Sequence, residues 1–208
     1  SARVITELLG LPKERWRELA DYATELGYVF SVTIKDDLPV IEHGLQGILD
    51  ISKALIDSRH GSDADDFVGT LIKANLDGSR ITDHELLSLV SMIVFAGFDT
   101  TRNQLGLGMQ TFSNFPNQWK KLADNPELGR QAVEEVMRVN PTITWVSREA
   151  SVDIEHKELT IKEGTTVHLL TIPAGSDPDK FAEPEFDIEK ERAPHFGFGG
   201  GMHHCIGH

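Results

Sequence analysis

Apolar residues recur every three or four positions through much of the first half of the chain, which is the spacing of one face of an α-helix. Over residues 12–27 this face is formed by Trp16, Leu19, Ala20, Ala23 and Leu26. The same spacing returns over 41–56, where Gly44 and Gly47 weaken the prediction because glycine is a poor helix former. A shorter helix is expected over 65–75. The first half of the chain is therefore predicted to be helical.

The most apolar segment begins just after a turn predicted at Asp77-Gly78. Thr82 and Glu85 have the spacing of a capping box, in which each side chain bonds the other residue's backbone N–H at the start of a helix. The apolar positions that follow occur on every side of such a helix: Leu86, Leu87, Leu89, Val90, Met92, Ile93, Val94 and Phe95. Because a helix that is apolar all round is normally buried, we expect one long, buried helix that ends before Pro116.

The pattern changes in the second half of the chain. Segments 144–151 and 159–170 are rich in Val, Ile, Thr and Trp, which predicts strands, with Lys162-Glu163-Gly164 as a hairpin turn. No internal repeat or linker-like stretch divides the sequence. We therefore expect a mainly α fold with a minor β region, formed as one continuous piece of a single domain over residues 1–208.

The chain is acidic, with 33 Asp and Glu against 20 Lys and Arg and a formal net charge of −13. This balance argues against nucleic acid or an anionic membrane as a partner, because both carry negative charge themselves. The longest mostly apolar stretch, 86–98, is too short to span a bilayer. A single cysteine cannot form an internal disulfide and fits a reducing compartment, so we expect a cytoplasmic location.

The last fourteen residues, HFGFGGGMHHCIGH, hold the most distinctive chemistry of the chain. They contain the only cysteine, Cys205, together with four histidines and five glycines. Glycine allows positive φ angles and lets a loop come close to a flat ligand or a metal. A lone cysteine in such a loop is inert, nucleophilic or a metal ligand.

Several kinds of site compete at this loop. A structural zinc site could use His203, His204, Cys205 and His208, but the sequence lacks the usual second spaced pair of ligands. A Cys/His nucleophilic pair would lack a defined third group. A phosphate-binding loop is excluded in practice, because no G-K-[ST] follows the glycines.

A second unusual stretch, Ala96-Gly97-Phe98-Asp99-Thr100-Thr101, lies inside the predicted buried helix. Polar groups cost free energy there unless they are paired. Gly97 and Thr100 are three residues apart and therefore share a helix face. In the structural alternative, Asp99 forms a cap or salt bridge and the threonine hydroxyls bond back to the preceding turn.

The spacing of Phe198, Gly201, His203, Cys205 and Gly207 fits the pattern F-x-x-G-x-H-x-C-x-G without gaps. This pattern resembles the heme-binding loop of the cytochrome P-450 family of heme-thiolate enzymes. An A-G-x-D-T-T motif and an E-x-x-R motif precede it in the family's order. The chain thus looks like an internal fragment of a soluble, bacterial-type cytochrome P-450, with the N- and C-terminal parts of that fold missing.

The resemblance implies iron protoporphyrin IX (heme b) as the cofactor, with the Cys205 thiolate as axial ligand of the iron. Asp99 and Thr100 would deliver protons to dioxygen, for which Gly97 leaves space. The residues expected to contact the cofactor are Gly97, Arg148, Phe198, Gly201, His203, Cys205 and Gly207.

Within that set, Arg148 and His203 would anchor propionates and Phe198 would shield the sulfur; the alternative for Arg148 is an ordinary surface arginine on a strand. Glu135 and Arg138 of E-x-x-R would form an internal structural pair. The expected substrate-pocket residues are Phe95, Ala96, Trp145 and Val146. Ser176 departs from the arginine expected before Asp-Pro, which leaves a local brace in doubt.

The implied reaction is a monooxygenation, in which one atom of dioxygen enters a small apolar substrate and the other leaves as water. Electrons would come from a separate ferredoxin-type donor, since the sequence has no flavin or nicotinamide fingerprint. A peroxide-driven enzyme is the second hypothesis, and the Asp99-Thr100 pair argues against it. A non-catalytic zinc- or heme-binding module is the third. Both ends of the chain look cut, so we expect the fragment by itself to be inactive.

Overall fold

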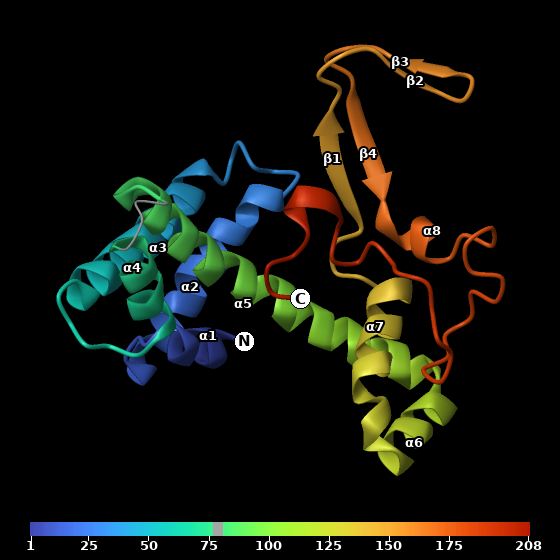
Figure 1. The fold of residues 1–208 in the computed structure, drawn as a ribbon, viewed down its shortest axis with the longest axis horizontal. Helices are drawn as coiled ribbons and strands as arrows, with labels where there is room; N and C mark the ends of the chain where they lie inside the picture. The colour runs from blue at the N-terminus through green and yellow to red at the C-terminus, as the bar shows by residue number, and fades with distance from the viewer. Residues whose placement is uncertain (77–80) are drawn as a thin grey trace. The chain divides into compact units, whose positions relative to one another are not determined.

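A computed structural model of the protein describes residues 1–76 and 81–208, with the backbone alone at residues 75 and 76 (Figure 1). The chain forms two compact units, Ser1–Arg102 and Asn103–His208. Helices dominate and the strands form two small sheets, so the predicted mainly α fold with a minor β region is confirmed. The turn predicted at Asp77-Gly78 lies outside the described residues, and the single domain over 1–208 stays a prediction.

The first unit consists of helices joined by loops. They are α1 (Ala2–Leu8), η1 (Lys13–Arg15), α2 (Trp16–Gly27), η2 (Tyr28–Phe30), α3 (Leu38–Arg59), α4 (Phe67–Leu76) and the first part of α5 (Asp83–Asn114). The helices predicted over 12–27, 41–56 and 65–75 are therefore confirmed to within a few residues.

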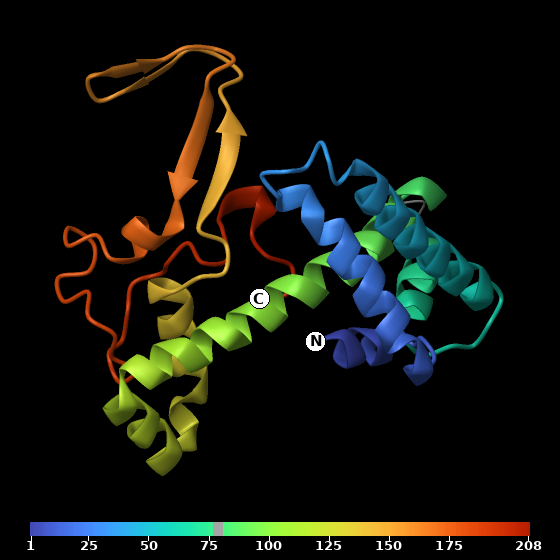
Figure 2. The same ribbon diagram turned by 180° about the vertical axis from the view of Figure 1, so that it is seen from behind.

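Two glycines explain how closely α2 and α3 approach each other, as they run side by side in Figure 2. A Cβ atom at Gly44 would lie 2.7 Å from the carbonyl oxygen of Tyr22, and one at Gly47 would lie 2.5 Å from the Tyr22 ring. Neither position has room for a side chain. The residues that weaken the sequence prediction of α3 are thus the ones that let α3 pack against α2.

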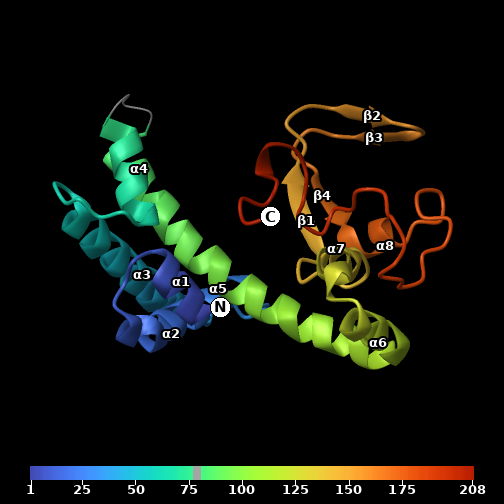
Figure 3. The ribbon, with the colours of Figure 1, turned by 60° about the horizontal axis from the view of Figure 1, so that its bottom comes forward.

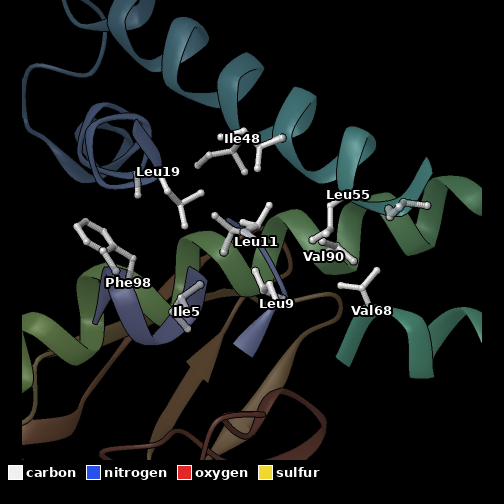
Figure 4. Packing of buried hydrophobic residues seen from close by; sticks show 14 of the residues in the cluster. Ile5, Leu9, Leu11, Leu19, Ile48, Leu55, Val68, Val90 and Phe98 are labelled. Carbon is white, nitrogen blue, oxygen red and sulfur yellow. The ribbon is translucent and has the colours of Figure 1, made fainter. Parts of the chain in front are cut away.

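Apolar side chains from α1 to α5 form the core of the first unit (Figure 4). Its buried members include Ile5, Leu9, Leu11, Leu19, Ile48, Leu55, Val68, Val90 and Phe98. Helices that would each be unstable alone in water are held together by this shared apolar surface.

The capping box predicted from Thr82 and Glu85 is present at the start of α5. The Thr82 N–H donates to Glu85 Oε2 at 2.7 Å, and the Glu85 N–H donates to Thr82 Oγ1 at 3.2 Å. The hydrogen bonds from Thr82 hold the pKa of the Glu85 carboxyl below its usual value. The helix ends at Asn114, before Pro116, as predicted.

The prediction that α5 is buried on every side is wrong. Leu86, Val90, Val94 and Phe98 form one buried stripe at helical spacing, whereas Met92 on another face is 49% exposed. The other helices of the first unit pack on that single stripe. Of the remaining large apolar positions of α5, Phe112 is buried in the second unit, and the others are half-buried or exposed.

The second unit contains the end of α5, further helices and all the described strands. These elements are α6 (Pro116–Asp124), η3 (Pro126–Leu128), α7 (Gly129–Val139), β1 (Trp145–Glu149), β2 (Ile154–His156), β3 (Leu159–Ile161), β4 (Thr166–Leu170), α8 (Thr171–Gly175) and η4 (Gly201–His203). Its core is formed by Phe112, Ala132, Val136, Phe186 and Ile188.

The strands pair as two antiparallel hairpin-like sheets, β1 with β4 and β2 with β3 (Figure 3). Trp145 lies opposite Leu170 in the first sheet. The turn predicted at Lys162-Glu163-Gly164 is present: Gly164 has a φ of +76°, and the Thr165 N–H donates to the Lys162 carbonyl at 3.0 Å. The strands predicted within 144–151 and 159–170 are confirmed.

Among the described residues, no helix combines the length and the apolar character that crossing a membrane requires.

Candidate functional site

The cysteine loop, residues 195–208, is shaped by two glycines with left-handed backbone conformations. Gly199 has a φ of +74° and Gly201 a φ of +69°, which a residue with a side chain rarely adopts. The turns place the Cys205 N–H against the carbonyl of Phe198 at 2.9 Å. This hydrogen bond closes the loop, and the Cys205 thiol is exposed.

Two further glycines of the cysteine loop differ in the space around them. A Cβ atom at Gly197 would lie 2.6 Å from the carbonyl oxygen of Met137 on α7, so the loop runs directly against the helix backbone. A Cβ atom at Gly207 would lie 3.9 Å from the Cys205 sulfur, at ordinary contact distance. Glycine at Gly207 therefore leaves the space beside the sulfur open.

Phe198 and His203 have different surroundings in the loop. The Phe198 ring meets the His208 ring edge-on with centroids 4.9 Å apart and lies 6.0 Å from the His195 ring. His203 is exposed. The shielding role of Phe198 and the propionate role of His203 both stay predictions.

A buried ion network ties α7 to the loop that leads into the cysteine segment. Arg138 donates to both carboxylate oxygens of Glu135, each at 2.7 Å, and to the carbonyls of Gly175 and Pro184. Arg192 donates to the same carboxylate at 2.9 Å. Glu135 is 1% exposed, and the side chain of Arg138 is completely buried.

We call Glu135, Arg138 and Arg192 the ion brace. The pair predicted from E-x-x-R forms and is internal, and Arg192 is a third member that the sequence analysis missed. The hydroxyl of Ser176, which stands where an arginine is expected before Asp-Pro, donates to the Ile172 carbonyl of α8 at 3.1 Å.

Arg148, Trp145 and Val146 lie on β1, in the same unit as the cysteine loop. The Arg148 guanidinium is exposed and donates to the carbonyl of Ser147 at 2.8 Å. Trp145 is 57% exposed, and Val146 is half-buried opposite Leu169. The strand therefore presents a permanently charged fork and a large aromatic ring at the surface of this unit.

The A-G-x-D-T-T motif lies on α5 in the first unit. The Thr100 hydroxyl donates to the Ala96 carbonyl at 2.6 Å, and Asp99 forms an ion pair with Arg102. These are the contacts that the structural alternative predicts. The proton-delivery role of Asp99 and Thr100 is not tested by them and stays a prediction.

Gly97 and Phe95 make contacts inside the first unit. A Cβ atom at Gly97 would lie 2.5 Å from Cδ1 of Ile5, so the space that this glycine leaves is filled by α1. This packing role differs from our expectation that Gly97 leaves room for dioxygen. Phe95 stacks on Phe30 with ring centroids 6.1 Å apart, and Ala96 is exposed.

In the described part of the chain, no three His, Cys, Asp or Glu side chains are grouped so that they could hold a metal ion. The His203, His204, Cys205 and His208 side chains that a zinc site would need are all exposed. The geometry therefore gives no support to the structural zinc alternative.

Comparison with known proteins shows which family the chain is similar to. A family model described as cytochrome P-450 matches residues 35–208. Luteothin monooxygenase of Streptomyces thioluteus is 38% identical over 99% of this chain and 52% of its own length. The fold matches the bacillaene polyketide synthase cytochrome P-450 PksS of Bacillus subtilis 168 with a TM-score of 0.90 and 30% identity, over 98% of this chain and 52% of that one.

A second solved structure is a cytochrome P-450, BioI, in complex with an acyl carrier protein ligated to hexadec-9Z-enoic acid. It matches with a TM-score of 0.88 and 32% identity, over 99% of this chain and 53% of its own. The chain belongs to the cytochrome P-450 family. It spans about half the length of the curated relatives that it matches.

The residues of the cysteine loop fit the heme that this family implies. A single exposed thiol is the kind of group that ligates heme iron in heme-thiolate proteins. Around it, the same loop exposes three large apolar side chains, Phe196, Met202 and Ile206, which a flat apolar cofactor would cover. Its glycines carry no side chains, so the backbone can come close to such a ligand.

Three residues that the sequence analysis left without a role contact the motifs. Arg192 joins Glu135, and Glu134 contacts His195, with its Oε2 3.0 Å from His195 Nε2. Each partner lies more than fifty residues away along the chain. The available sequence signal was weak: Glu134 is adjacent to the E-x-x-R glutamate, and His195 opens the cysteine loop.

Proposed function

We propose that this chain is the heme-binding part of a heme-thiolate monooxygenase acting on an apolar organic substrate. The observation that carries the proposal is the exposed thiol of Cys205, held in a glycine-rich loop by the Cys205 N–H···O=C Phe198 hydrogen bond. When bound, heme would supply the activation of dioxygen, with one oxygen atom entering a C–H bond of the substrate and the other leaving as water after uptake of two electrons from the donor and two protons. The protein's part is to bind, orient and protonate.

Cys205 would hold the cofactor through its sulfur, and the propionates would be bound by Arg148 and His203. Both side chains are exposed in the unit that carries the loop. A guanidinium presents parallel N–H donors to a carboxylate, and an imidazole can donate one more. Gly201 and Gly207 would keep the backbone close to the plane of the ligand, with Phe198 beside the sulfur.

Asp99 and Thr100 would move protons toward the oxygen that is being reduced. The Thr100 hydroxyl donates its hydrogen bond to the Ala96 carbonyl, but its oxygen can still accept a hydrogen bond from a proton donor. Asp99 is partly exposed to solvent and forms an ion pair with Arg102. In the proposed role it would pass protons from water toward the site. Phe95, Ala96, Trp145 and Val146 would line the substrate pocket.

The relatives' names support an apolar organic substrate. They include a luteothin monooxygenase and a polyketide synthase cytochrome P-450, and BioI was solved with an acyl carrier protein bearing a fatty acid. We propose a ferredoxin-type donor for this protein. Its single thiol and its net charge of −13 suit the cytoplasm and a role without nucleic acid or membrane.

The test is spectroscopic and uses the full-length protein. After reduction and addition of carbon monoxide, heme with thiolate ligation shows a red-shifted Soret band, and its absence would overturn the proposal. Product formation is then measured with a ferredoxin, its reductase and dioxygen, and separately with hydrogen peroxide. Turnover with peroxide but not with dioxygen would favour the peroxide-driven alternative.

Replacing Thr100 by alanine is expected to uncouple this reaction. Substrate would still bind and reductant would still be consumed, but several-fold more of the oxygen would leave as hydrogen peroxide because a proton-relay hydroxyl is lost. The measurement is the ratio of peroxide to product formed. Thr101→Ala is the matched control, since it removes a neighbouring exposed hydroxyl from the same helix. Equal coupling in Thr100→Ala and Thr101→Ala would show that Thr100 serves only the helix.

A further inference from the structure

Two adjacent glutamates on α7 have different partners. Glu135 belongs to the ion brace, whereas Glu134 faces the cysteine loop. Glu134 Oε2 lies 3.0 Å from His195 Nε2, and its Oε1 lies 3.8 Å from His208 Nε2. One carboxylate therefore faces histidines at both ends of the loop that carries Cys205.

The hydrogen bonds of His195 define its tautomer. The Gly197 N–H donates to His195 Nδ1 at 3.0 Å, so this nitrogen is an acceptor. A neutral imidazole then carries its proton on Nε2, which points at Glu134. The His195 side chain is only 6% exposed, whereas the Glu134 carboxylate that it faces is 40% exposed, so the ring nitrogens are the sheltered side of this contact.

These contacts continue as far as the cysteine. Gly197, held by His195, is followed by Phe198, whose carbonyl accepts the Cys205 N–H at 2.9 Å. The Phe198 ring is near the rings of both His195 and His208, with centroids 6.0 and 4.9 Å away. Displacing His195 would therefore move the backbone that positions the Cys205 sulfur.

We infer that Glu134 is a positioning residue, which fastens the cysteine loop to α7 through His195 and so fixes where the Cys205 sulfur lies. The consequence for metal ligation rests on the proposed function. A ligand must be held within about 0.5 Å of its working position, and the groups that orient it affect metal binding nearly as strongly as the ligand itself. Glu134 acts by orienting a ligand and does not touch the cofactor.

The inference is tested with Glu134→Ala and His195→Ala in the full-length protein. In the heme-loaded variants we expect a large share of the reduced, carbon-monoxide-bound form to lose the thiolate band and absorb as a neutral-thiol complex. In the heme-free variants, hydrogen exchange of the peptide spanning 196–205 should be about tenfold faster or more, because two hydrogen bonds that close the loop are weakened. The unfolding midpoint is measured in parallel.

Conservative variants separate the two bonds of His195. An asparagine at position 195 can still accept from the Gly197 N–H as an Asx turn but is too short to reach Glu134. A glutamine can reach Glu134 but offers no acceptor at the δ position. We expect H195N and H195Q each to retain part of the thiolate band, and Glu134→Gln, which keeps an acceptor for Nε2–H, to retain most of it. Glu127→Gln in η3 is the charge-matched control and should behave as wild type.

The inference is overturned if Glu134→Ala and His195→Ala keep the wild-type thiolate share and the wild-type exchange rate. It is also overturned if they only lower the unfolding midpoint, because a purely structural role predicts that result. If wild type itself lacks a thiolate band, the proposed function fails. The exchange experiment on the heme-free protein then still decides whether Glu134 holds the loop.

Discussion

Replacing Cys205 by alanine in the full-length protein is expected to abolish the thiolate-type spectrum completely. No second cysteine exists in this chain to take over the role of ligand. A histidine of the same loop could bind iron in its place, but neutral imidazole ligation does not give the red-shifted band of a thiolate. The measurement is the difference spectrum of the reduced protein with and without carbon monoxide.

Met202 provides the control for this experiment. It is the other sulfur-containing side chain of the cysteine loop and is strongly exposed, and a thioether is only a weak donor. Met202→Leu should leave the thiolate band unchanged. If Cys205→Ala retained the band and Met202→Leu did not, the assignment of the ligand would be wrong. Loss of the band in Cys205→Ala alone would support Cys205 as the ligand.

Local patterns in the sequence were sufficient to predict the helices and strands. Helical spacing located α2, α3 and α4, and the capping box at Thr82 and Glu85 located the start of α5. Each of these signals acts over a few residues, within one or two turns of helix. The turn at Gly164 was likewise predicted because positive φ favours glycine.

Contacts between distant residues could not be predicted in this way. Gly44 and Gly47 looked like weak points of a helix, because the atoms of α2 that occupy their space lie in another element. These atoms include the Tyr22 carbonyl oxygen at Gly44 and the Tyr22 ring at Gly47. The same holds for Gly97, whose missing side chain accommodates Ile5 of α1. A periodicity argument describes one element at a time and contains no information about which partner covers it.

The same distinction between local patterns and long-range contacts applies to the candidate site. The pattern of the cysteine loop was read directly, since all its residues lie within fourteen positions. Its attachments to α7 were not predicted, because His195 and Glu134 are separated by 61 residues and Arg192 and Glu135 by 57. The sequence analysis therefore identified the loop as the candidate carrier of the ligand. It missed two contacts of α7, one with the cysteine loop and one with the segment just before it.

The ion brace has an unusual charge balance that makes it sensitive to substitution. One carboxylate, Glu135, faces the two guanidiniums of Arg138 and Arg192. It also accepts the Asp187 N–H at 3.0 Å. Charged groups are costly to bury, and a buried pair is stable only while each charge keeps its partner. The carbonyls of Gly175, Pro184 and Glu185 satisfy further donors of Arg138 but carry no formal charge.

Replacing Glu135 by glutamine should therefore lower the free energy of unfolding by about 3–5 kcal/mol, although the two side chains have nearly the same shape. The variant leaves the buried Arg138 and the largely buried Arg192, which is 13% exposed, without a counter-charge. It also puts an amide N–H₂ against their N–H groups. Urea unfolding of the full-length protein measures the change. Asp124→Asn in α6 is the control, because it neutralises one partner of an exposed ion pair with Lys120 and should change the unfolding free energy very little. Equal effects of Glu135→Gln and Asp124→Asn would show that the buried carboxylate does not stabilise the second unit.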